Sequence, residues 1–223
     1  MDKKKPWISN QNRINRVAWC KDHVNWTEED WRKVLFSDES PFQLRDNGKK
    51  RVWKLCEEEF HCSHYTGTVK HDVKINVWGC FSYDGVGTLY LVDGNMDARQ
   101  YCKILKSAML PSADVHFPDG EFIFQQDNDP KHTSSMVYEY LDSKGIDYMD
   151  WPAYSPDLNP IENLWAILKQ RMRDRKCRNE DELWEYVQEA WYNLPVEMLA
   201  GLIDSMQRRC RAVIEKKGYP TKY

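Results

Sequence analysis

Residues 151–169, WPAYSPDLNPIENLWAILK, join a proline-rich turn to the start of an amphipathic helix. Asn159 is a natural N-cap residue, and Pro160 suits the first helical position, where a backbone N–H would lack a partner. Hydrophobic residues then recur at helical spacing over residues 161–172. Glu162 therefore falls in the first turn of the helix, at the edge of its buried face.

Two interpretations of Glu162 follow from this position. In the first, Glu162 completes a capping box and accepts the backbone N–H of Asn159. In the second, it belongs to a site with Asp38 and Asp127, each of which follows a hydrophobic run and is expected to end a strand. Strand ends are where α/β sheets present polar groups, and hard divalent cations require oxygen ligands. This shared pattern favours a carboxylate site formed by Asp38, Asp127 and Glu162.

Composition limits the class of protein. The chain has 223 residues, of which 41% are hydrophobic and 13% aromatic, which excludes wholesale disorder and fits one domain or at most two small ones. The net charge of −3 does not itself indicate a nucleic-acid-binding domain. Basic residues nevertheless cluster at 169–178, KQRMRDRKCR, either as the solvated end of a helix or as a contact surface for phosphate.

The seven cysteines form no CxxC pair, and the sequence contains no signal peptide or long apolar segment. We therefore expect a reduced intracellular protein. The local cluster Cys56, His61, Cys62 and His64 does not have the usual spacing of paired zinc ligands, which argues against a zinc site.

The order of expected elements predicts the fold class. We expect helices at 10–23, 97–109, 133–143, 161–172, 183–194 and 199–213, and strands at 34–36, 51–54, 73–81, 88–92, 121–126 and 146–149. A turn at 46–48 would make a hairpin of the first two strands, and residues 42–44 are compatible with a continuation of the first. Ile14, Val17, Ala18 and Cys20 are expected to face inward. This order predicts an α/β protein with a ribonuclease-H-like (retroviral-integrase-like) mixed sheet flanked by helices.

Five segments carry a family resemblance: VLFSDES (34–40), VWGCFS (77–82), FQQDNDPKHT (124–133), WPAYSPDLNPIENLW (151–165) and the final TKY. Together they resemble the catalytic domain of mariner-superfamily DDE transposases, from about residue 4 to residue 223. An interval of 34 residues between Asp127 and a final Glu resembles the Tc-type branch, whereas mariner elements proper end in Asp.

The resemblance implies a metal-dependent DNA transposase in which Asp38, Asp127 and Glu162 are catalytic and hold two Mg²⁺ ions, with Mn²⁺ as a substitute. Such a pair of ions would serve phosphodiester cleavage at transposon ends and then attack of the freed 3′-hydroxyl on a TA target. The expected partners are therefore transposon-end and target DNA, with a possible homodimer and no membrane. The expected location is the nucleus.

Residues near the triad have more than one interpretation. Lys131 is expected to face phosphate, and Lys169 and Arg173 to contact DNA from the helical row that also contains Glu162. His132 either contacts substrate phosphate, orients a carboxylate, or caps and packs at a helix start. Asp129, followed by a proline, is expected to form a turn.

The expected organisation is a linker and helix at 1–32 and a catalytic domain at 33–223, with a loop insertion near 55–70. Relatives carry a helix-turn-helix region before the catalytic domain, and we expect it to be absent here. The sequence after Arg51 departs from the family's dimer clamp, so clamping is not predicted. Two alternatives stay open: a truncated or domesticated non-catalytic relic that binds DNA or protein, and a ribonuclease for RNA–DNA hybrids. The intact triad favours the transposase.

Overall fold

The computed structural model describes residues 8–44, 73–173, 175 and 177–223. One mixed sheet runs through this part of the chain, in the order β3-β2-β1-β4-β5. Its strands are β1 (Val34–Leu44), β2 (Val73–Phe81), β3 (Tyr90–Val92), β4 (Ile123–Gln125) and β5 (Asp147–Tyr148). β2 is antiparallel to β1 and β3, whereas β4 is parallel to β1 and β5. The predicted mixed sheet is therefore confirmed.

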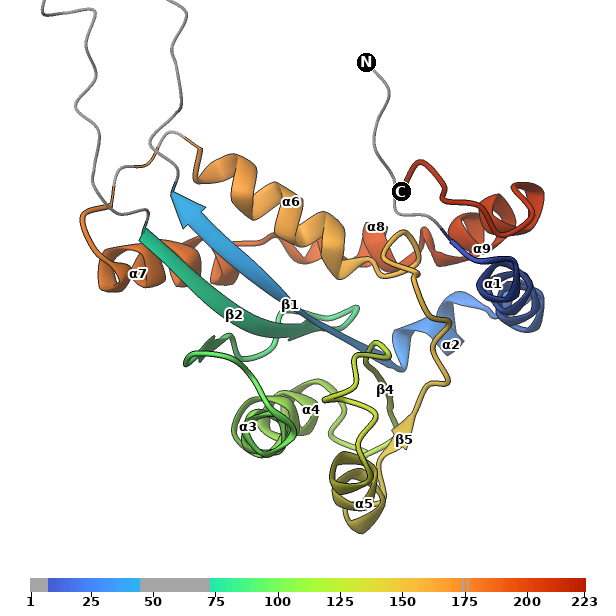
Figure 1. The fold of residues 1–223 in the computed structure, drawn as a ribbon, viewed down its shortest axis with the longest axis horizontal. Coiled ribbons are helices and arrows are strands. Elements are labelled where there is room, and N and C mark those ends of the chain that lie inside the picture. Colours follow the sequence, from blue (N-terminus) through green and yellow to red (C-terminus); the bar gives the residue numbers. More distant parts are fainter. Residues whose placement is uncertain (1–7, 45–72, 174, 176) are drawn as a thin grey trace, which may run out of the picture.

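Helices cover both faces of this sheet (Figure 1). On one face lie α6 (Ile161–Arg171) and α7 (Glu180–Tyr192), and on the other lie α3 (Ala98–Ile104), α4 (Leu110–His116) and α5 (Ser135–Ser143). The remaining helices are α1 (Asn10–His23), α2 (Glu28–Arg32), α8 (Val196–Ile203) and α9 (Met206–Glu215). None of the described helices is long and apolar enough to span a membrane.

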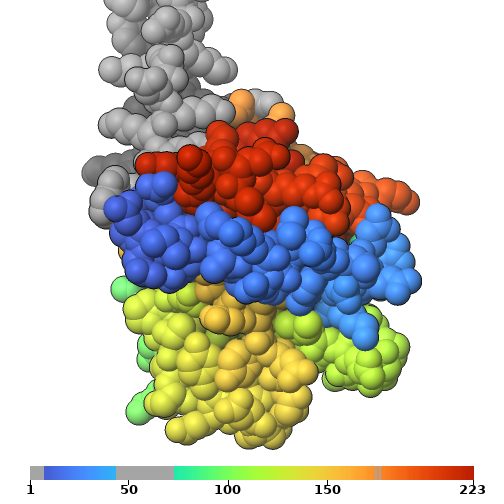
Figure 2. Space-filling view, turned by 90° about the vertical axis from the view of Figure 1, so that its right-hand side faces the viewer, coloured from blue at the N-terminus to red at the C-terminus, as the bar shows by residue number. Residues whose placement is uncertain are grey.

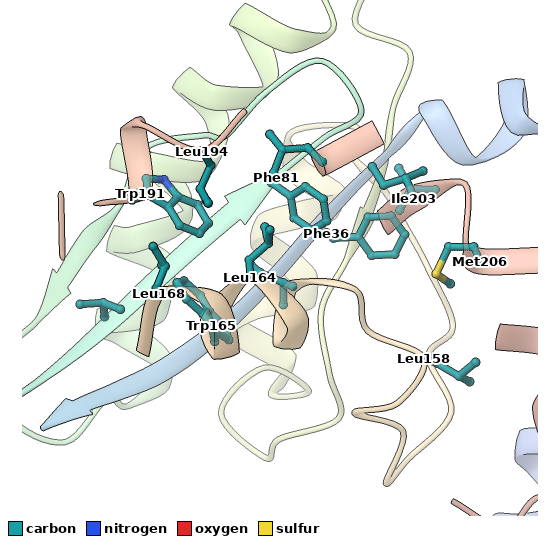
Figure 3. Packing of buried hydrophobic residues seen from close by; sticks show 14 of the residues in the cluster. Phe36, Phe81, Leu158, Leu164, Trp165, Leu168, Trp191, Leu194, Ile203 and Met206 are labelled. Atoms are coloured by element: carbon teal, nitrogen blue, oxygen red, sulfur yellow. The ribbon is translucent and has the colours of Figure 1, made fainter. Parts of the chain in front are cut away.

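The alternation of side chains along β1 divides the core into two layers. Phe36 and Phe42 pack in the layer that contains α6 and α7, whereas Leu35 packs in the layer that contains α3 and α5. Figure 3 shows the first layer, with Leu164 of α6 near Phe36 and Trp191 of α7 near Trp165. Because successive side chains point to opposite faces of a strand, Asp38 belongs to the α6 face and Glu39 to the α3 face.

The first strand is longer than predicted, and Asp38 does not end it. β1 continues to Leu44 and is paired with β2 from Phe36 opposite Phe81 to Leu44 opposite Val73. This pairing satisfies the backbone of the polar stretch after Phe36, and Phe42 then returns to the core with its ring 6.0 Å from that of Trp165. The turn at 46–48, the strand at 51–54, the cluster at 56–64 and the loop at 55–70 lie outside the described residues.

The expected inward face of α1 was partly wrong. Ile14 is 62% exposed, whereas Arg16 and Cys20 are fully buried. The reason is that α1 packs beside α9 and an ion pair compensates the charge of Arg16. Figure 2 shows the N-terminal helices as a blue band between the red C-terminal helices and the yellow region around α5.

Two predicted helices have different limits. The helix expected at 97–109 continues through a π-helical turn (Leu105–Met109) into α4, which ends at His116. The segment expected as one helix at 199–213 divides into α8 and α9 around Asp204 and Ser205. The helical phase of the sequence is preserved on both sides of that break, which is why periodicity alone did not reveal it.

Candidate active site

The three predicted catalytic carboxylates border one open groove of about 450 Å³. Asp38 comes from the middle of β1, Asp127 from the segment after β4, and Glu162 from the first turn of α6. Residues 128–130, residues 151–156 and Asn159 complete the lining. Residues that are far apart in the sequence thus meet where β1 and β4 lie side by side in the sheet.

Hydrogen bonds from neighbouring residues hold the three carboxylate-bearing segments together. Ser37 Oγ donates to the carbonyl of Gln125 at 2.7 Å, which ties β1 to the end of β4. Asn159 Nδ2 donates to the carbonyl of Ser37 at 3.2 Å, which ties the start of α6 to β1. Asn128 Nδ2 donates to the carbonyl of Trp151 at 2.6 Å. The relative positions of the carboxylates therefore depend on neutral hydrogen bonds beside them, of which those of Ser37 are buried.

The start of α6 does not form the capping box. The Asn159 side chain accepts the backbone N–H of Ile161 at 3.3 Å, and the Asn159 backbone N–H donates to the carbonyl of Pro156 at 3.2 Å. The helix begins at Ile161, but its N-cap position is occupied by Pro160 instead of the predicted Asn159, and Glu162 is exposed in its first turn. Glu162 is therefore available to a ligand in the groove.

The carboxylates repel one another across the groove. Burial raises the pKa of Asp38 well above its usual range, and the charges of Glu162, Glu39 and Asp127 raise it further. Partial desolvation at the edge of the groove also raises the pKa of Glu162, with Asp127 adding to the effect and Lys169 opposing it. A bound cation would relieve this repulsion.

The donor set fits a hard divalent cation. Four carboxylates, those of Asp38, Asp127, Asp129 and Glu162, line the groove, and no cationic side chain is among its described lining residues. Oxygen-only ligands suit Mg²⁺, which keeps several waters and uses few carboxylates. Within the described chain, no three His, Cys, Asp or Glu side chains already converge as a closed metal cluster, so the carboxylates border the groove rather than meet at one point.

His132 lies between two carboxylates. Its Nδ1 donates to Asp127 Oδ1 at 2.6 Å and its Nε2 donates to Glu39 Oε1 at 2.9 Å. Burial alone would lower the pKa of His132, but these two carboxylates outweigh it and raise the pKa to about 9. Burial would conversely raise the pKa of Asp127, but hydrogen bonds from His132 and from the backbone N–H of Asp129 lower it. Asp127 is thus ionised at neutral pH.

The predicted DNA-contacting residues occupy different surroundings. Lys131 pairs with Asp129 at 2.6 Å and lies 3.8 Å from Glu39, and the ring of His132 is buried. Lys169 is exposed on α6 with its Nζ 5.5 Å from the centre of the Phe42 ring, and Arg173 is exposed just after α6. Their contact with DNA stays a prediction. Asp129 forms the expected turn, because its carboxylate accepts the backbone N–H of Lys131.

Sequence reasoning missed Glu39 and Tyr101. The Tyr101 ring lies against the ring of His132, with centroids 4.0 Å apart. Glu39 directly follows Asp38, and strand alternation could have placed it on the opposite face, but nothing in the sequence links it to His132, 93 residues away.

A buried ion pair supports the loop before α6. Arg16 of α1 binds Asp157 Oδ2 at 2.8 Å and also donates to Ser155 Oγ at 2.8 Å. From α9, Arg209 donates to the backbone carbonyl of Asp157 at 2.9 Å. The backbone N–H of Thr221 donates to the Asp157 carboxylate, at Oδ2, over 2.9 Å. The loop that leads to Glu162 is therefore held from both ends of the described chain.

A protein family and several transposases are similar to this chain in sequence. A family model described as "DDE superfamily endonuclease" matches residues 33–184. The Tcb2 transposase of Caenorhabditis briggsae and the Tc1 transposase of Caenorhabditis elegans are each 42% identical over 99% of this chain and 81% of their own lengths.

Solved structures agree with the fold. The crystal structure of the Mos1 mariner transposase catalytic domain matches with a TM-score of 0.79 at 15% identity, over 99% of this chain and 100% of that one. A Mos1 paired-end complex with Mn matches with a TM-score of 0.84 at 16% identity, over 100% of this chain and 68% of that one. The chain belongs to the DDE superfamily of endonucleases, as a transposase catalytic domain homologous to the Tc1/mariner enzymes.

Proposed function

We propose that this domain cleaves phosphodiester bonds at the ends of a DNA transposon and joins the freed 3′-hydroxyl to a TA target, with the help of divalent cations. One observation carries the proposal. Three carboxylates from separate elements border a single groove, in a chain 42% identical to the Tc1 transposase. The alternative of a non-catalytic relic is not favoured, because all three carboxylates are present at that groove.

In this proposal Asp38, Asp127 and Glu162 hold two Mg²⁺ ions, for which Mn²⁺ can substitute. When bound, two such ions would activate the attacking oxygen and stabilise the leaving oxygen of an in-line displacement. The protein supplies the geometry: β1 and α6 position Asp38 and Glu162, and a hydrogen bond from His132 lowers the pKa of Asp127. Mos1 structures that contain Mn or Mg support the assignment of divalent cations.

The proposal extends to partners. Structures of Mos1 include a complex with the left transposon end and a strand transfer complex. By homology, transposon-end DNA would lie over the groove, with Lys169 and Arg173 of the α6 row beside its phosphates and with Lys131 and His132 near Asp127. A homodimer and a nuclear location are parts of the same proposal.

The test is cation-dependent nicking of supercoiled plasmid DNA, followed by strand transfer of a pre-cut transposon-end duplex. We expect Asp38→Asn, Asp127→Asn and Glu162→Gln each to lower the nicking rate by about a hundredfold or more, because metal ligation is worth several kcal/mol in the transition state. Asp114→Asn, on the exposed face of α4, is the matched control and should retain full activity. Nicking without divalent cations, or full activity of the triad variants, would overturn the proposal.

A further inference from the structure

The imidazole of His132 is the link between the groove and the opposite face of the sheet. The residue is only 2% exposed, yet its two ring nitrogens lie 2.6 Å and 2.9 Å from carboxylate oxygens of Asp127 and Glu39. Carboxylate oxygens accept hydrogen bonds, so both nitrogens donate. The ring thus connects the carboxylate of Glu39, in β1, with the carboxylate of Asp127, in the segment after β4.

Contacts with Tyr101 and Gln126 hold the His132 ring in its orientation. Tyr101 of α3 lies over it with ring centroids 4.0 Å apart. The hydroxyl of Tyr101 donates to Gln126 Oε1 at 2.9 Å, and Gln126 Nε2 donates to the carbonyl of His132 at 3.2 Å. Rotation of the imidazole would therefore break a closed set of buried contacts.

Glu39 is not placed to bind a cation in the groove directly. It does not line the groove, and strand alternation places it on the face opposite Asp38. Its carboxylate contacts His132, and Lys131 Nζ lies 3.8 Å from its second oxygen. The hydrogen-bonded connection from Glu39 to Asp127 therefore passes through His132.

Asp127 is the group on which this arrangement acts. Its side chain is about half exposed to the groove, at 48%. Oδ1 accepts both the His132 ring and the backbone N–H of Asp129, the latter at 3.0 Å. Because both hydrogen bonds meet at Oδ1, Oδ2 is the oxygen left for a ligand.

We propose that Glu39 is a positioning residue of the active site, which acts through His132 to hold Asp127 with Oδ2 directed to the groove. This inference rests on the metal-binding role proposed above for Asp127. Outer hydrogen-bond partners of metal ligands commonly change metal affinity by about 10- to 100-fold. A purely structural ion pair would change stability but not the affinity of the folded protein for the cation.

The experiment measures Mn²⁺ affinity by titration calorimetry on the full chain, without any need for catalysis. We expect Glu39→Ala and His132→Ala each to weaken Mn²⁺ binding about tenfold. Glu39→Gln and His132→Asn should recover part of the loss, because Gln keeps an acceptor for Nε2 and Asn keeps a donor near the position of Nδ1. Glu121→Ala is the control, since Glu121 forms an exposed ion pair with Lys33.

Nicking kinetics separate positioning from a general loss of structure. Glu39→Ala should raise the Mn²⁺ concentration that gives half-maximal rate about tenfold, while kcat at saturating Mn²⁺ stays within about threefold of that of the unchanged protein, because this variant keeps all three proposed ligands. A second readout is the ¹⁵N NMR spectrum of the imidazole, which should show two protonated ring nitrogens that Glu39→Ala perturbs. Circular dichroism checks that each variant folds. If Glu39→Ala does not fold, Mn²⁺ affinity is measured on Glu39→Gln instead, with an expected loss of about threefold.

The outcomes distinguish the two proposals. Unchanged Mn²⁺ affinity in the folded Glu39 and His132 variants, with loss of binding in Asp127→Asn, would overturn the positioning role and leave the proposed function standing. Absence of saturable Mn²⁺ binding by the unchanged protein, with or without duplex DNA, would overturn the proposed function and the inference together.

Discussion

At the scale of single residues, one glycine lets two tryptophans reach the sheet beside the candidate active site. Gly79 pairs with Asp38 across β1 and β2. A Cβ at this position would lie 2.8 Å from Trp165 Cη2 and 3.2 Å from Trp191 Cη2. The two indole rings are themselves stacked, with centroids 5.0 Å apart, as the close approach of their side chains in Figure 3 illustrates. Both rings are buried, and protein interiors are close-packed, so an added methyl group would have to displace them.

Gly79→Ala should therefore destabilise the protein by about 1–3 kcal/mol, the usual cost of overpacking a core. Gly201→Ala is the matched control, because a Cβ on this α8 residue would meet nothing within 4 Å. Replacing an unhindered helical glycine should stabilise the fold by about 0.5–1 kcal/mol. Urea denaturation measures both. Equal and small effects of the two substitutions would contradict the packing described at Gly79.

At the scale of elements, the entry to α6 depends on the buried pair of Arg16 and Asp157. Breaking a buried pair by removing one partner leaves the other charge uncompensated, which costs about 3–5 kcal/mol. We expect Asp157→Asn to lower the free energy of unfolding by this amount at pH 7, measured by urea denaturation. Glu28→Gln, which removes the exposed contact with Arg32 at 4.0 Å, is the control and should change it by less than about 0.5 kcal/mol.

The same pair predicts a pH dependence. Burial would raise the pKa of Asp157, but the hydrogen bond and charge of Arg16 outweigh it and lower the pKa below its ordinary value. A carboxyl group with a lowered pKa in the fold stabilises the protein above its unfolded pKa, and this contribution is lost as the pH falls through the folded pKa. The stability difference between the unchanged protein and Asp157→Asn should thus shrink below about pH 4. A difference that stays constant from pH 7 to pH 3 would contradict this account.

The elements also show what local sequence signals can predict. Asp127 and Glu162 lie beside such signals, the end of a hydrophobic run and an Asn-Pro helix start, and both reach the groove as expected. The continuation of β1 past Asp38 depends on pairing with β2, a distant segment, so the polar stretch there was misread as a strand end. Buried Arg16 is a similar case, because Asp157, which compensates its charge, lies 141 residues away in the sequence. Local patterns carry no information about such partners.

At the scale of the whole molecule, an acidic chain must approach a polyanion. The net charge is −3, and the groove itself is lined by carboxylates. Binding of DNA therefore depends on cations in the groove and on basic side chains around it. Lys169 and Arg173 lie along the helical row that begins at Glu162, and the charge of Lys169 already influences the pKa of Glu162. This row is the surface from which α6 would meet phosphates.

Salt dependence of DNA binding tests that placement. A protein that neutralises a phosphate releases counterions, so each lost contact reduces the slope of log K against log salt by about 0.9. We expect Lys169→Ala and Arg173→Ala each to reduce the slope by this amount, equally for duplexes with and without TA, measured by fluorescence anisotropy over a KCl series. Lys131→Ala should have a smaller effect, because Asp129 and Glu39 already compensate its charge. Lys106→Ala, exposed on the opposite layer, is the control, and a slope that falls as much in this variant would mean that α6 does not face the DNA.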